Sequence, residues 1–160
     1  MVRSGIALAI LTMSSATAAL AADEAVSIEA GARIAVMGGC HDCHTSGYAQ
    51  SGGKIDPANA LKGDGVGFQG PWGTTYPSNL RITVTKMDED AFVSFGHSFQ
   101  ARPPMPWFNV HAFSEAELRS FYRYVKSLGE PGEPAPAYVE PGGKPVTPFI
   151  VFAPPQMPAQ

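Results

Sequence analysis

The sequence predicts a small all-α domain, and three observations lead to this prediction. Apolar residues recur at helical spacing in three segments that carry capping residues at their ends. The alternation of apolar and polar residues that marks a half-buried strand is sparse along the chain. The 160 residues suffice for one domain with a modest core, and no internal repeat indicates a solenoid or a propeller.

The first predicted helix begins at about Ser27 and ends at Gly38 and Gly39. Ser27 is a good N-cap, because its hydroxyl can accept a hydrogen bond from a free backbone N–H of the first turn. Gly31 lies in the middle of this helix, where glycine lowers helix stability. We therefore expect another element to pass close to Gly31.

Two further helices follow in the second half of the chain. One is predicted from near Thr85 to about His97, with acidic residues in its first turn, where they complement the helix dipole. The other starts with a capping-box pattern at Ser114 and Glu117 and ends at Gly129. Its apolar stripe is expected to pack on the first helix around the central glycine of that helix. The stripe consists of Leu118, Phe121, Tyr122, Val125 and Leu128.

The N-terminus predicts export to the periplasm. Arg3 precedes an apolar run from Gly5 to Met13, and small residues ending at Ala21 follow, which is the order typical of a secretory signal peptide. We expect cleavage after Ala21, so that residues 1–21 are a signal peptide. The apolar run is shorter than the roughly 20 residues needed to span a bilayer, so no transmembrane segment is predicted in the mature chain.

Charge and composition narrow the range of partners. The formal net charge is −3 at pH 7, and loss of Arg3 with the signal peptide makes the mature chain one unit more negative. No cluster of Lys and Arg interleaved with aromatic residues is present, so nucleic acid is not an expected partner.

Composition divides the mature chain into a predicted domain over residues 22–130 and a Pro-rich extension over residues 131–160. Repeated prolines forbid helix in the extension, which is either a disordered tail or an extended segment that lies on the domain or on a partner. Within the domain, residues 45–84 are rich in Gly, Pro, Asn and Ser. So long an irregular segment in a small domain indicates that it wraps a group that is not protein.

The segment GGCHDCHTSG, residues 38–47, carries the strongest chemical signal. It contains Cys-x-x-Cys-His, the sequence at which haem vinyl groups are attached through thioether bonds. On one helical turn, two cysteines three residues apart can reach two vinyl groups, and the next residue can place an imidazole beneath the iron. The motif predicts one covalent haem c, attached through Cys40 and Cys43, with His44 as an axial iron ligand.

Other chemistries of this motif are weaker interpretations. A thioredoxin-like redox pair needs a preceding strand in a parallel βαβ context, whereas a helical pattern precedes this motif. A structural zinc site needs two more ligands, and only three scattered histidines remain, namely His41, His97 and His111. A disulfide between cysteines three residues apart closes too small a loop to restrain the unfolded chain much.

A low-spin electron-transfer haem also needs a sixth ligand, usually methionine or histidine. Met105 is the best candidate, because the prolines around it in ARPPMPWF stiffen an extended loop that can hold a thioether in place. His97 and His111 flank this loop and are the rival ligands. His41, inside the motif, is expected to face solvent.

These residues together resemble the class I c-type cytochromes. The resemblance covers about residues 27–130 and rests on a helix with a central glycine, on GGCHDCHT, on the Pro-bracketed methionine and on ELRSFYRYVKSL near the end. The stretches GPWGTTYPSNL and RPPMPWF are similar to those of cytochromes associated with periplasmic dehydrogenases. The chain departs from such relatives after SNL, where it reads RITVTKMDED. The resemblance implies the class I cytochrome c fold, in which N- and C-terminal helices cross and long irregular loops wrap the haem.

The resemblance also implies roles for individual residues. The first and last helices would cross at Gly31, with Tyr124 or Tyr122 packed on it. The carbonyl of Pro57 would accept a hydrogen bond from the imidazole of His44 and so orient the ring. Three further residues are implied to cover or hydrogen-bond the haem propionates, namely Trp72, Tyr76 and Asn79.

The expected function is that of a periplasmic one-electron carrier. With His44 and Met105 both bound, the iron has no open position for a substrate, and methionine ligation raises the potential. Electrons would come from a dehydrogenase and pass to another cytochrome or a terminal oxidase. The same chemistry would serve a subunit fixed in a dehydrogenase complex. The alternative is a haem enzyme or a gas- or peroxide-reactive protein with an open distal site, in which His97 or His111 acts as acid or base.

Overall fold

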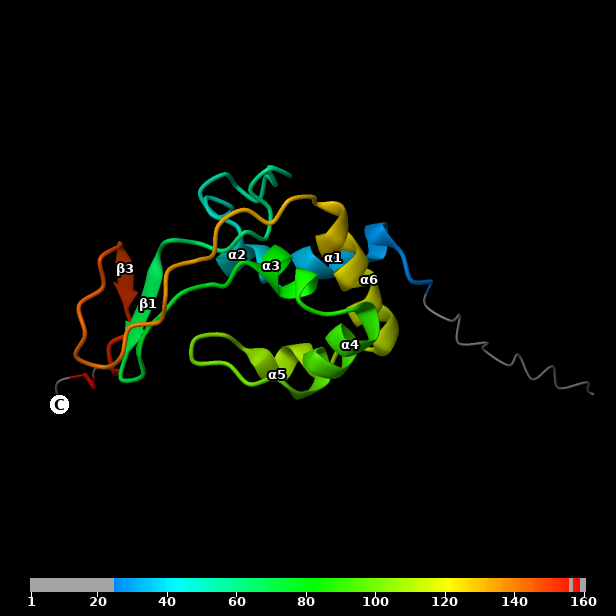
Figure 1. Ribbon diagram of the computed structural model, residues 1–160. Coiled ribbons are helices and arrows are strands. Elements are labelled where there is room, and N and C mark those ends of the chain that lie inside the picture. Colours follow the sequence, from blue (N-terminus) through cyan, green and yellow to red (C-terminus); the bar gives the residue numbers. More distant parts are fainter. Residues whose placement is uncertain (1–24, 156, 159–160) are drawn as a thin grey trace, which may run out of the picture.

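The computed structural model describes residues 25–155 and 157–158, so the predicted signal peptide lies outside the described residues. Within this range, helices gather at one end of the molecule and a small sheet lies at the other (Figure 1). The elements, in chain order, are α1 (Ile28–Met37), α2 (Cys40–His44), β1 (Gly67–Gly70), β2 (Gly73–Thr75), α3 (Leu80–Thr85), α4 (Glu89–Ser98), α5 (Trp107–Val110), α6 (Glu115–Ser127) and β3 (Phe149–Val151).

The three helices expected from the sequence are present as α1, α4 and α6, but α4 begins at Glu89 and not near Thr85, which is the last residue of α3. Their caps explain where they begin. The Ser27 hydroxyl accepts from the Ala30 N–H at 3.0 Å at the start of α1. Asp88 caps α4 through its carboxylate. At α6, Ser114 and Glu117 each accept a hydrogen bond from the other's backbone N–H, which completes the capping box.

The all-α fold class is wrong, because the described chain contains a three-stranded mixed sheet in the order β2-β1-β3. β1 and β2 form an antiparallel hairpin, and β3 pairs in parallel with the other side of β1, with Phe68 opposite Ile150. The architecture is therefore not a clear class I cytochrome c fold. Each strand has only three or four residues, β1 and β2 contain glycine, and β3 comes from the Pro-rich extension. The alternation of apolar and polar residues that marks a strand cannot be recognised over so few residues.

The closest approach between helices is at Gly31, where α1 crosses α6. A Cβ built on Gly31 would lie 2.0 Å from the Ser120 carbonyl oxygen and 2.7 Å from the Tyr124 Cβ. Only glycine leaves room for the two backbones, and the loss of helix propensity is the cost of this contact. The predicted crossing is confirmed, with Tyr124 as the aromatic residue on Gly31. Tyr122 lies on the α4 side, where its hydroxyl donates to the Met87 carbonyl at 3.1 Å.

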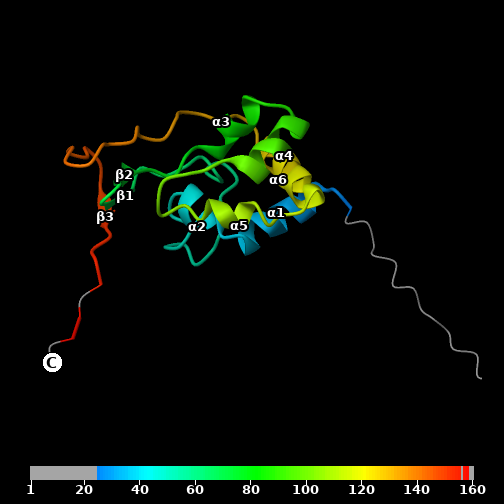
Figure 2. The same ribbon diagram turned by 90° about the horizontal axis from the view of Figure 1, so that it is seen from below.

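The hydrophobic core lies between α6 and the helices packed on it, seen from below in Figure 2. The apolar stripe of α6 faces α1, α3 and α4, as expected from its spacing. The buried core residues are Ile34, Ala35, Leu61, Val84, Phe92, Val93, Leu118, Phe121, Tyr124 and Val125. Among the described residues, no helix is long and apolar enough to cross a membrane.

Replacing Gly31 by alanine is expected to destabilise the fold by roughly 1–3 kcal/mol, because the added methyl group must push α6 away from α1. The measurement is the free energy of unfolding in urea. Gly65→Ala is the matched control, since a Cβ there meets nothing within 4 Å and the backbone is outside the left-handed region. Equal effects of the two substitutions would contradict the role given to the crossing.

Candidate functional site

The Cys-His motif forms its own short helix, α2, which follows α1 after a two-glycine turn. Gly39 has a φ of 69°, in the left-handed region, and lets the chain change direction between the two helices. The crossing of α1 with α6 thus determines where α2 starts. All five residues of Cys-His-Asp-Cys-His are helical, so the predicted placement of the cysteines on one helical turn is confirmed.

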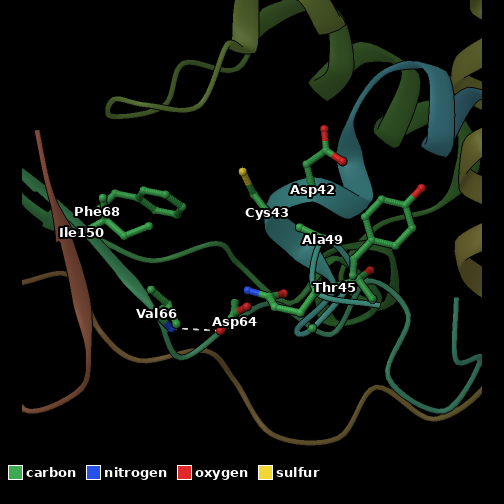
Figure 3. A pocket seen from close by; sticks show the side chains of 11 residues that line it. Asp42, Cys43, Thr45, Ala49, Asp64, Val66, Phe68 and Ile150 are labelled. Atoms are coloured by element: carbon green, nitrogen blue, oxygen red, sulfur yellow. Dashed lines mark hydrogen bonds between the residues drawn. The ribbon is translucent and has the colours of Figure 1, made fainter. Parts of the chain in front are cut away.

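Cys43 opens into a small hollow between α2 and the sheet. Figure 3 shows its sulfur pointing away from α2 toward Phe68 of β1 and Ile150 of β3. Val66 lies on the same wall, and Asp64 accepts from the Val66 N–H at 2.9 Å. The thiol therefore faces a mostly apolar wall supplied by the strands that the sequence did not reveal.

Both thiols are free and protonated at neutral pH. Burial raises the pKa of Cys40 to about 12, and burial together with the nearby Asp42 carboxylate raises the pKa of Cys43. A redox-active cysteine pair needs a lowered thiol pKa, because the thiolate is the nucleophile. The surroundings of Cys40 and Cys43 have the opposite effect and disfavour thiol–disulfide chemistry.

His44 is buried and fixed in one orientation. Its Nδ1–H donates to the backbone carbonyl of Ser78 at 2.7 Å, since a carbonyl can only accept. Burial lowers the pKa of the ring below its ordinary value, so the imidazole is neutral at pH 7. Its Nε2 then carries the free lone pair, for which the described structure records no hydrogen-bond donor. A neutral imidazole with Nδ1 bound to a carbonyl and Nε2 unprotonated is the form in which histidine ligates a metal.

The expected acceptor for His44 is corrected from Pro57 to Ser78. The Pro57 carbonyl instead accepts from the guanidinium of Arg81, and Pro57 itself is exposed. Sequence distance misled the prediction, because the loop after His44 returns to its backbone at Gly63, whose N–H donates to the His44 carbonyl at 2.9 Å. The imidazole of His44 meets the chain later, at Ser78.

Arg81 and Asn79 hold the segment that carries the Ser78 carbonyl. Arg81 is 2% exposed and donates to carbonyls before and after α3: Ala60 at 2.8 Å, Leu128 at 2.7 Å, Glu130 at 3.3 Å, and Pro57. Asn79 caps α3 through its Oδ1 and donates through its amide to the carbonyls of Pro131 and Glu133 at 2.8 and 2.9 Å. Asn79 is thus a structural link to the extension, and each of its polar atoms has a protein partner.

Trp72 and Tyr76, the other expected propionate neighbours, also have protein partners. The indole N–H of Trp72 donates to the Phe68 carbonyl at 3.3 Å. The Tyr76 hydroxyl accepts from the Thr147 hydroxyl at 3.0 Å. Both side chains are half-buried and join the hairpin region to the extension.

His41 is fully buried, so the expectation that it faces solvent is wrong. Its Nδ1 lies 2.7 Å from the Thr45 hydroxyl, and its Nε2 lies 3.5 Å from the Tyr124 hydroxyl. In the helix α2, Cys43 faces the sheet and His44 faces the Ser78 segment, so His41 points to a different side, toward Tyr124 of α6. Burial lowers the pKa of His41 as well. Its role is to attach α2 to α6.

Met105 lies in the segment between α4 and α5, which Figure 1 shows extending from α5 toward the sheet, below α2. The side chain is half-buried. His111, one rival ligand, donates from its Nε2–H to the Phe99 carbonyl at 2.8 Å and packs on Trp107. His97, the other, is exposed in the last turn of α4. Among these three candidate ligands, Met105 is half-buried and its sulfur has no recorded hydrogen bond. His97 is exposed, and the Nε2 of His111 is already engaged with the Phe99 carbonyl.

Ser78, Arg81 and Tyr138 are the residues that sequence reasoning missed. Ser78 contributes only a backbone carbonyl, which no side-chain pattern can reveal. For Arg81 one signal was present, a single arginine two residues after the N-cap asparagine, in the first turn of an otherwise apolar and β-branched helix. In the described residues, no group of three or more His, Cys, Asp or Glu side chains is arranged to hold a metal ion.

Arg81→Lys is expected to lower the free energy of unfolding by about 2–3 kcal/mol, because one ammonium group cannot reach the carbonyls that the guanidinium joins. Urea denaturation measures this change. Arg123→Lys is the control, since the Arg123 side chain is 47% exposed and solvent screens its ion pair with Glu89, which therefore contributes little to stability. A loss at Arg81 no larger than that at Arg123 would refute the structural role of the buried guanidinium.

The chain was compared with models of protein families, with curated proteins and with solved structures, and none of them matches it.

Proposed function

We propose that this protein is a periplasmic one-electron carrier that binds a single haem c through Cys40 and Cys43. The observation that carries the proposal is the state of His44. A buried neutral imidazole, oriented by the Ser78 carbonyl and with Nε2 open, directly follows two protonated thiols on one helical turn. This arrangement meets the requirements of covalent haem attachment and proximal ligation.

Of the residues proposed to hold the haem, Cys43 lines the hollow beside α2, whereas Cys40, His44 and Met105 do not. Cys40 and Cys43 would supply the two thioether sulfurs, and His44 would supply the proximal nitrogen. Phe68 and Ile150 form apolar surface in front of Cys43, as the faces of a macrocycle require. The bound haem supplies reversible gain and loss of one electron. Arg81, Asn79 and Ser78 keep the imidazole in one orientation and so limit reorganisation around the iron.

Met105 is proposed as the distal ligand. If His44 and Met105 both ligated the iron, no ligand position would remain for a substrate, and the chemistry that the group would supply is electron transfer. A dehydrogenase would be the donor, and a cytochrome or terminal oxidase would be the acceptor. An iron that lacks the Met105 ligand would instead be open to peroxide or gases, and the optical spectrum separates these two cases.

Cys40→Ala combined with Cys43→Ala is expected to abolish covalent haem attachment, because no thiol then remains to form a thioether. The measurement is the mass of the denatured protein after co-expression with a haem-attachment system. We expect unmodified protein to gain the mass of one haem and the double variant to gain none. Retention of haem mass by the double variant would overturn the attachment site.

Met105→Ala is expected to keep the covalent haem and to convert the ferric iron from low spin to high spin. The optical spectra of oxidised and reduced protein report this change, together with loss of the weak long-wavelength band of methionine-ligated ferric haem. Met37→Ala is the matched control, because Met37 is 78% exposed on α1 and should leave both spectra unaltered. An unaltered low-spin spectrum in Met105→Ala would show that Met105 is not the ligand. A high-spin spectrum in the unsubstituted protein would favour the enzyme or sensor alternative.

A further inference from the structure

The segment that carries Met105 has few means of holding its own shape. Pro103, Pro104 and Pro106 have no N–H to donate, so the backbone cannot form a ladder there. Its internal hydrogen bonds are short-range ones, from the Met105 N–H to the Arg102 carbonyl at 3.3 Å and from the Trp107 N–H to the Met105 carbonyl at 2.9 Å. A thioether held at a fixed place therefore requires contacts from outside the segment.

Two such contacts are made at the tip of the segment. The Arg102 guanidinium lies over the ring of Tyr138, 3.8 Å from its centroid. The Thr75 hydroxyl, on β2, donates to the Pro103 carbonyl at 2.7 Å. Both contacts lie within three residues of Met105, one from the hairpin and one from the C-terminal extension. At the base, the bond from His111 to the Phe99 carbonyl closes the segment.

Tyr138 is itself anchored to the hairpin. Its hydroxyl donates to the Trp72 carbonyl at 2.6 Å, and Val139 exchanges two backbone hydrogen bonds with Thr74, at 2.8 and 3.0 Å. Gly73 permits this approach, since a Cβ there would lie 2.3 Å from the Val139 carbonyl oxygen. The ring of Tyr138 is therefore a fixed platform, on which the Arg102 guanidinium packs.

We propose that Tyr138 and Arg102 are positioning residues for Met105, and that the C-terminal extension keeps the distal methionine in place. The cation–π contact joins the Met105 segment to a platform built on β2, and the bond from Thr75 to Pro103 fixes its direction. The extension would act on the distal bond through the Met105 segment. This inference rests on the proposed haem ligation by Met105.

The test is competition between Met105 and an external ligand. Ferric holoprotein is titrated with cyanide, and loss of the methionine band is followed in unsubstituted protein, Arg102→Ala, Arg102→Lys and Tyr138→Ala. We expect Arg102→Ala to bind cyanide roughly two- to five-fold more tightly, which is the effect of losing an exposed cation–π contact. Tyr138→Ala should show a larger change, because it also loses the bond to the Trp72 carbonyl. Arg102→Lys keeps the cation and should restore most of the unsubstituted behaviour.

Lys126→Ala is the matched control, because Lys126 makes a similar contact, 5.9 Å from the centroid of the Tyr122 ring on α6, away from Met105. Its cyanide affinity should equal that of unsubstituted protein. Tyr138→Phe is the milder variant should Tyr138→Ala fail to fold, and it should give an intermediate change.

The outcomes separate this inference from the proposed function. If the unsubstituted protein shows the methionine band but Arg102→Ala and Tyr138→Ala bind cyanide as it does, the positioning role is wrong and the carrier function stands. If the unsubstituted protein is high-spin, methionine ligation fails, and the positioning role is overturned with it. Tighter cyanide binding in both variants, with rescue by lysine and no change in Lys126→Ala, supports the inference.

Discussion

The contact on which the rest of the structure depends is the crossing of α1 and α6 at Gly31. Because a Cβ there would collide with the Ser120 carbonyl, the two helices lie closer than ordinary side chains permit. Their crossing sets the direction of α1, and the turn at Gly39 then sets where α2 begins. His41 completes this arrangement by placing its ring between Thr45 and Tyr124. The position of the Cys-x-x-Cys-His helix thus depends on the contact between α1 and α6 at Gly31, several residues earlier in the chain.

A second constraint comes from the buried guanidinium of Arg81, whose N–H groups donate to backbone carbonyls and not to a carboxylate. Arg81 is buried against backbone carbonyls of two chain segments, and no acidic side chain is recorded as its partner in the described structure. Such an arrangement is costly to form by desolvation and costly to break, since each carbonyl would lose its donor. It therefore fixes the segment around Ser78 firmly. The orientation of His44 follows from the rigidity of that segment and not from the imidazole itself.

Local signals predicted what depends on neighbours in the sequence. The caps at Ser27, Asp88 and Ser114 and the glycine at residue 31 carry their physical reasons within a few residues, so α1, α4 and α6 were predictable. The order of residues in the cysteine motif carries its chemistry in the same way. What escaped prediction depends on chain segments that are distant in sequence.

The sheet exists because β3 returns from the extension to pair with β1 about 80 residues earlier in the chain. The Ser78 carbonyl meets His44 across 34 residues. The burial of His41 follows from the direction of α2, which no periodicity in five residues can show. These features are set by tertiary contacts, and the local sequence of a short Gly- or Pro-rich stretch does not predict such contacts.

The change of composition at residue 130 is therefore not a change of structural unit. The extension begins by accepting two hydrogen bonds from Asn79, continues as the anchored platform at Tyr138 and ends by adding β3 to the hairpin. Each of these contacts reaches the irregular part of the domain, which has little regular secondary structure to hold it. Prolines suit this task, because an extended chain with restricted φ loses less conformational entropy when it is laid along a surface. The extension also reaches the hollow in front of Cys43, because Ile150 of β3 lies beside Phe68 of β1 on its wall.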